Sequence, residues 1–151
     1  MKLLPIAALS LWLGACAARH EALEVRQFKL RDQRTDYAED PMVRMEKQRH
    51  LRGAVSLEER RQRLGQYFTV LWKDESDSTT GPVEVLFEYR QGASGSRIKR
   101  QSRRFPAGTT SGEALFQVTG DDYFTGGRVV SWQTTLRRDQ NVIASRRSYL
   151  W

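Results

Sequence analysis

Cysteine and histidine are scarce in this sequence. Its 151 residues include one cysteine, Cys16, and two histidines, His20 and His50. One thiol cannot form an intramolecular disulfide, and a structural zinc site takes four ligands that are mostly cysteine and histidine. Nucleophilic catalysis needs a base within reach of an activated nucleophile, and no residue spacing here indicates such a pair. A glycine-rich phosphate loop is missing too, so we predict a non-enzymatic protein without a cofactor or a metal ion.

Two further polar groups lack the neighbours that a functional site would need. Asp121 and Asp122 follow a glycine, and together they supply only two of the six to eight oxygen ligands that calcium takes. We therefore interpret residues 120–127 as a solvated loop. His50 lies near the predicted end of a helix, and we interpret it as a side chain on a solvent-facing helix surface.

A long hydrophobic run is also missing. Residues 3–13 are apolar apart from one serine and follow Met1 and Lys2, whereas a transmembrane helix needs about 20 apolar residues. A charged start, an apolar run of roughly 7–15 residues and small residues before a cleavage site are typical of a secretory signal. We predict that residues 1–15 are a signal peptide.

The motif Leu13-Gly14-Ala15-Cys16 closes this run. It resembles the lipobox of bacterial lipoproteins. The resemblance implies that the Cys16 sulfur receives a diacylglycerol, that a signal peptidase cleaves between Ala15 and Cys16, and that the new amino group is acylated, for example with palmitate. Ala17, where an aspartate would retain the protein in the inner membrane, implies an outer-membrane location facing the periplasm. Attachment through two or three chains is stable, because each buried methylene contributes about 0.8 kcal/mol.

Acidic residues are absent from residues 89–112. The chain has 25 basic and 18 acidic residues, a net charge of +7. Without residues 1–15, whose one charged residue is Lys2, 24 basic and 18 acidic residues remain, a net charge of +6. Residues 89–112 contain six basic residues and account for that whole excess, which makes them the candidate contact for an anionic partner. The six are Arg90, Arg97, Lys99, Arg100, Arg103 and Arg104.

Alternation of apolar and polar residues predicts seven strands. The pattern is clearest in residues 83–90, where Val83, Val85, Phe87 and Tyr89 share one face. The other predicted strands are residues 23–31, 67–74, 96–105, 113–119, 128–138 and 142–151. Short strands with frequent turns are typical of an all-β sandwich. We predict a mainly β fold, a seven-stranded antiparallel β-sandwich of the immunoglobulin or fibronectin type, with Trp132 in its core.

Helix signals lie between the first two predicted strands. Asp40 before Pro41 is typical of an N-cap followed by proline at the first helical position. Ser56 and Glu59 have the spacing of a capping box, and Gly65 is a suitable end for that second helix. We predict a two-helix insert at about residues 40–65 in a single domain over residues 23–151, which follows a lipidated tether at residues 16–22.

Both alternating faces of residues 96–105 are mostly polar. Arg97, Lys99, Gln101 and Arg103 share one face, and Ile98, Arg100, Ser102 and Arg104 share the other. This predicts an edge strand or an arm of a projecting hairpin. Its charges either block edge-to-edge pairing or contact an anionic lipid, lipopolysaccharide, a wall polymer or an acidic protein. Nucleic acid is not expected in this compartment, and no aromatic residues interleave with the charges.

We therefore expect a membrane-anchored envelope lipoprotein that acts as a non-catalytic interaction or structural module. Two alternatives stay open: an accessory subunit of an envelope assembly that docks through residues 40–65, and a small-ligand-binding or hydrolytic protein with a loop-built site. The aromatic tail at residues 149–151 is expected to complete the last strand and cover the core, because aromatic side chains bury large areas.

Overall fold

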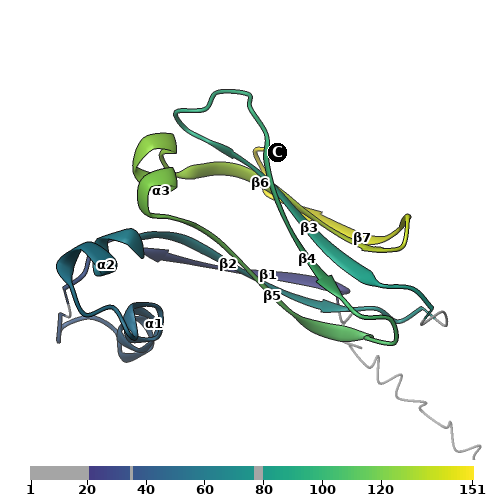
Figure 1. Cartoon of the computed structure of the whole chain (residues 1–151), viewed down its shortest axis with the longest axis horizontal. Helices are drawn as coiled ribbons and strands as arrows, with labels where there is room; N and C mark the ends of the chain where they lie inside the picture. Colours follow the sequence, from purple (N-terminus) through teal and green to yellow (C-terminus); the bar gives the residue numbers. More distant parts are fainter. Residues whose placement is uncertain (1–20, 35, 77–79) are drawn as a thin grey trace, which may run out of the picture.

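The computed structural model describes residues 21–34, 36–76 and 80–151. The predicted signal peptide, Cys16, His20 and most of the predicted tether lie outside the described residues. Two antiparallel sheets pack face to face in these ranges, and three helices lie at one end of the molecule (Figure 1). The prediction of a mainly β fold with seven antiparallel strands is confirmed.

Three strands make the first sheet, in the order β1-β2-β5, and four make the second, in the order β4-β3-β6-β7. We call them sheet A and sheet B. Sheet A contains β1 (Leu23–Leu30), β2 (Gly65–Lys73) and β5 (Ser111–Thr119). Sheet B contains β4 (Lys99–Phe105), β3 (Val83–Gln91), β6 (Val129–Arg138) and β7 (Asn141–Arg147). The alternation in the sequence therefore predicts every strand, with differences only at the ends.

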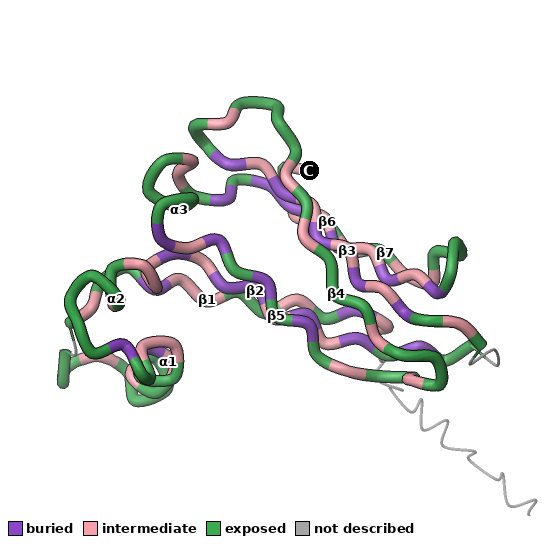
Figure 2. The backbone as a smooth tube through the Cα atoms, in the orientation of Figure 1, coloured by how far each residue is buried: buried purple, intermediate pink, exposed green. Residues whose placement is uncertain are grey.

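The core lies between the two sheets, where buried residues alternate along the central strands (Figure 2). Phe87 of β3 is its centre: its ring centroid lies 4.8 Å from that of Phe68 and 5.1 Å from that of Phe116, both on sheet A. Trp132 of β6 is also buried in this cluster, so its predicted place in the core is confirmed. Burial of such large apolar side chains is the main favourable contribution to folding.

Helices α1 (Pro41–Leu51) and α2 (Leu57–Gln62) lie between β1 and β2, and their predicted caps are confirmed. The Asp40 carboxylate accepts a hydrogen bond from the Met42 amide at 2.8 Å. Ser56 and Glu59 form both hydrogen bonds of a capping box. The predicted end at Gly65 is wrong, because Gly65 already belongs to β2. A Cβ there would meet the Val118 carbonyl at 2.2 Å, so the glycine permits close packing of β2 on β5.

Residues 120–127 are not the predicted loop. They contain a third helix, α3 (Gly120–Gly126), with Asp121 and Asp122 in its first turn, where negative charge is favourable. The buried Gln91 side chain holds this helix, because its Nε2 donates to the carbonyls of Asp122 and Gly127, each at 3.0 Å. This contact could not be predicted from the sequence, because Gln91 lies far from residues 120–127 along the chain.

The aromatic tail does not cover the core, which corrects the prediction for residues 149–151. β7 ends at Arg147, and Tyr149 is 100% exposed. Ser148 ends the strand pairing, because its hydroxyl accepts a hydrogen bond from the Trp132 amide at 3.0 Å. The chain then turns, and the Trp151 ring lies 4.5 Å from the Arg90 guanidinium.

Candidate anion-contact surface

β4 is an edge strand of sheet B, as its polar alternation predicts. It pairs with β3 alone within the described ranges, and its two alternating faces have different surroundings. One face turns toward sheet A, and the other belongs to the solvent side of sheet B. The basic segment is therefore divided between two environments.

The face of β4 that turns toward sheet A is engaged within the fold. Lys99 forms an ion pair with Asp122 of α3, which also accepts a 3.3 Å hydrogen bond from the Tyr89 hydroxyl. The Gln101 amide donates to the Gln117 carbonyl of β5 at 2.9 Å. Arg103 adds a cation–π contact to a core phenylalanine ring at 5.9 Å. These groups hold the edge of sheet B against sheet A, so they have a structural role.

The opposite face of β4 is the exposed one. Arg100 contacts Glu88 at 2.7 Å, and Arg104 contacts Glu84 at 3.5 Å. Glu84 also accepts a 2.7 Å hydrogen bond from Arg137 of β6. The carboxylates lie beneath the guanidinium groups: the Glu84 side chain is 12% exposed, whereas that of Arg104 is 77% exposed. Solvent on this side therefore meets positive charge first.

Glu84 remains ionised under these arginines. Burial alone would raise the pKa of the Glu84 carboxyl, but hydrogen bonds from Arg137 and Ser102 and the nearby positive charges lower the pKa overall. The negative charge of Glu84 holds the neighbouring arginine side chains in place. Such a preorganised cationic surface loses less conformational entropy when it meets an anion.

Strand register brings two more arginines to this side. Glu88 of β3 lies opposite Gln133 of β6, which lies opposite Arg147 of β7. Arg137 lies in the row that contains Glu84. We call the five arginines of this side the outer arginine face, which is offset by two glutamates and so has a net charge of +3. Its members are Arg90, Arg100, Arg104, Arg137 and Arg147.

The six predicted contact residues thus do not form one patch. Arg90, Arg100 and Arg104 lie on the outer arginine face, Lys99 and Arg103 face sheet A, and Arg97 lies in the exposed β3–β4 turn. Sequence reasoning missed two members of the face, Arg137 and Arg147. Both alternate with inward residues on their own strands, which was the available signal, but their strand register was unknown.

Asp122 and His50, which the sequence predicts to be solvated, both contact other side chains of the fold. Asp122 is engaged with Lys99, and the described ranges contain no group of three or more His, Cys, Asp or Glu side chains that could hold a metal ion. The prediction of a solvent-facing His50 is wrong. Its ring stacks on Tyr67 at 3.7 Å and on Phe28 at 5.3 Å, which docks α1 on sheet A. Burial lowers the pKa of the His50 imidazole, and the neighbouring Glu46 partly opposes that effect.

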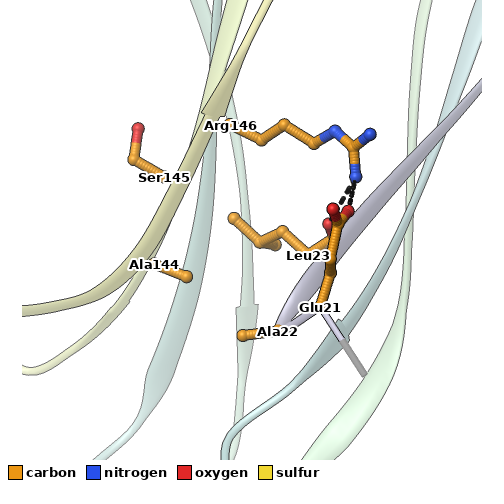
Figure 3. Close-up of a pocket in the computed structure, with 6 residues that line it drawn as sticks. All are labelled: Glu21, Ala22, Leu23, Ala144, Ser145 and Arg146. Atoms are coloured by element: carbon orange, nitrogen blue, oxygen red, sulfur yellow. Dashed lines mark hydrogen bonds and ion pairs between the residues drawn. The ribbon is translucent and has the colours of Figure 1, made fainter. Parts of the chain in front are cut away.

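A small hollow lies where β1 begins (Figure 3). Its volume is about 350 Å³, and it is lined by residues of the start of β1 and of β7. Arg146 reaches across from β7, forms an ion pair with Glu21 and donates to the Leu23 carbonyl at 3.1 Å. The charge of Arg146 is therefore neutralised within the chain, and its role is to fasten the first strand to sheet B.

Comparison of the chain with protein-family models, curated proteins and solved structures finds no match. Among the described residues, no helix has the length and apolar character needed to cross a membrane.

Proposed function

We propose that this protein is a lipid-anchored envelope lipoprotein whose β domain is a non-catalytic interaction module. The outer arginine face is its contact for an anionic envelope component. The observation that supports this proposal is the layered arrangement on sheet B, with exposed guanidinium groups above shielded carboxylates. The anchor follows from the lipobox resemblance at Cys16, and the outer-membrane location from Ala17.

The contact is electrostatic. Arginine presents several donors in a planar fork that matches carboxylate and phosphate groups, so a row of arginines suits a repeated anion better than a single small one. The groups that bear this charge come from four neighbouring strands, so the surface extends across the width of sheet B. β4 can also protect the open edge of sheet B from pairing with another chain. That role is compatible with anion contact, because the side chains toward sheet A hold the two sheets together and the outer arginines are left for the anion.

We also propose that the domain belongs to the broad immunoglobulin- and fibronectin-like group of sandwiches. Constant immunoglobulin domains place their fourth strand in the sheet of strands one, two and five. Here β4 pairs with β3 instead. The order therefore favours the fibronectin-type members of the group over constant immunoglobulin domains.

The test is co-purification of anionic envelope components with the natively lipidated, full-length protein. The variant Arg100→Gln/Arg104→Gln removes two charges that are each paired with a glutamate. The matched control Arg26→Gln/Arg61→Gln removes two arginines that are also paired with glutamates, elsewhere on the surface. The wild-type protein and the control should retain an anionic component that rising NaCl releases, and the Arg100→Gln/Arg104→Gln variant should lose it. Equal retention by all three proteins would refute the proposed contact.

A further inference from the structure

Helix α1 is docked with its polar side chains inward. Lys47 is 7% exposed, and its ammonium group contacts Glu39 at 2.6 Å, Asp32 at 3.1 Å and the Arg34 carbonyl at 3.3 Å. His50 takes the next inward position, one turn further along, between the two aromatic rings of sheet A. A lysine and a histidine thus hold this helix to the domain.

The apolar side chains of α1 face solvent instead. Met42 is 65% exposed and Met45 is 59% exposed. Arg49 continues the same row, because residues three and four apart share one face of a helix. Arg52 is the C-cap residue that follows α1 and lines the same groove. A surface helix normally has the opposite arrangement, with its apolar stripe toward the core. Other large exposed apolar side chains lie nearby in sequence, namely Tyr37, Val55 and Leu57.

A groove of about 440 Å³ runs beside Met45. It is lined by Met45, Glu46, Gln48, Arg49 and Arg52. Glu46 is occupied within the helix, with its carboxylate 3.6 Å from Arg49 and 3.5 Å from the His50 imidazole. Arg49 also lies 3.8 Å from Glu113 of β5, so its charge is shared between two carboxylates. The groove lining still holds two guanidinium groups and one carboxylate, and Arg52 supplies the positive charge that suits an acidic side chain beside an apolar one.

Helix α1 lies away from the point where the predicted tether joins β1. α1 contacts the far end of β1, through Phe28, whereas the anchored end enters at Leu23 (Figure 1). Five strand residues at about 3.3 Å each put roughly 17 Å between those two points. This step rests on the proposed lipid anchor.

We propose that the outward face of α1 docks an acidic, amphipathic segment of a protein partner. Met42 and Met45 supply the apolar contact, since flexible thioethers adapt to partner side chains. Arg49 and Arg52 pair with the carboxylates of that segment. The helix therefore gives the protein a second interaction surface, separate from the outer arginine face of sheet B.

A benzophenone amino acid in place of Met45, in the full-length chain and in its native cells, tests this proposal. We expect a crosslink to a protein segment in which Asp or Glu residues flank apolar residues. The same group in place of the equally exposed Val142 of β7 should not give that product. A crosslink to lipid, to a second copy of this chain or to a basic segment overturns the proposal, as does the absence of any protein crosslink. Acyl labelling of the same sample reports separately on the anchor.

Charge reversal distinguishes a specific electrostatic contact from a crosslink that reports only closeness in space. Arg49→Glu/Arg52→Glu should lower the crosslinking yield about tenfold, because a repulsive charge pair replaces an attractive one. Arg61→Glu/Arg97→Glu, which reverses two exposed arginines outside this groove, is the matched control and should leave the yield unchanged. A synthetic peptide of the crosslinked segment should bind the Met42→Ser/Met45→Ser variant about tenfold more weakly than the wild-type chain. Equal affinity for the two proteins overturns the proposal, and an unchanged circular dichroism spectrum shows that the variant is folded.

Discussion

Arg138 and Asp74 form a buried ion pair that joins sheet B to the end of sheet A. The Arg138 Nε and Nη2 atoms lie 2.8 and 2.7 Å from Asp74 Oδ2. The same guanidinium donates to the carbonyls of Gly81 at 2.8 Å and Thr109 at 2.9 Å. One side chain therefore fixes two connecting segments and both sheets at the end of the molecule opposite the helices.

Replacement of Arg138 by methionine should destabilise the domain strongly. The variant leaves the Asp74 carboxylate and two carbonyls without this donor, and breaking a buried ion pair costs about 3–5 kcal/mol. Urea unfolding measures this free energy. Arg26→Met, which removes an exposed ion pair, is the control and should leave the urea midpoint close to that of the wild-type protein. Equal midpoints for the two variants would contradict the structural role of Arg138.

The same pair predicts a loss of stability in acid. Burial alone would raise the pKa of the Asp74 carboxyl, but hydrogen bonds from Ser76 and Arg138 hold the pKa below its ordinary value. The folded state therefore binds the Asp74 proton less readily than the unfolded state. Its stabilising contribution is present above the unfolded pKa of about 3.9 and is lost as pH falls through the folded pKa. Asp74→Asn should flatten this part of the stability profile, measured as melting temperature against pH.

His50 predicts a second effect at milder pH. Because burial lowers the pKa of its imidazole, the unfolded chain takes up this proton first as pH falls. The contribution of His50 is present above about pH 6.5 and decreases as pH falls toward the folded pKa. Hydrogen exchange of the α1 amides should therefore accelerate in mild acid. The rates should lose this dependence in His50→Phe, which keeps the stacking on Tyr67; an identical pH dependence in that variant would contradict the assignment.

Removal of the aromatic tail should have a small effect. Tyr149 is fully exposed, so its removal should not measurably lower the free energy of unfolding. Trp151 contributes only its contact with Arg90. An exposed cation–π contact is worth about 0.5–1 kcal/mol. A double-mutant cycle of Arg90→Ala and Trp151→Ala should give a coupling free energy of that size. Additive effects of the two substitutions would show that the contact does not stabilise the fold.

The lipid anchor has its own test at Cys16. Cys16→Ser removes the only thiol in the chain, so incorporation of labelled fatty acid should disappear. The protein should also leave the membrane fraction. Ala17→Asp is the control for location, because it retains the cysteine and should keep the acyl label while redistributing the protein between membranes. Persistent labelling of Cys16→Ser would refute the anchor.

Local signals predicted the elements of this fold well. The caps at Asp40 and Ser56 were predictable because a cap is made by residues within three or four positions of each other. The strands were predictable because alternation reports which side of a strand is buried. The edge position of β4 followed from two polar faces. Errors appeared where a contact came from far along the chain, as for α3, which Gln91 holds, and for the tail, which Ser148 turns away.

The sequence by itself determined the strands, the helix caps, the uneven distribution of charge and the resemblance at residues 13–16. All of these depend on residues that are near one another in the chain. The tertiary structure alone decided which charges share one surface, because strand register placed Arg137 and Arg147 on the same side of sheet B as Arg100 and Arg104. It also turned His50 inward and Met45 outward on one helix, since a side chain's burial depends on the surface that it meets and not only on its own polarity.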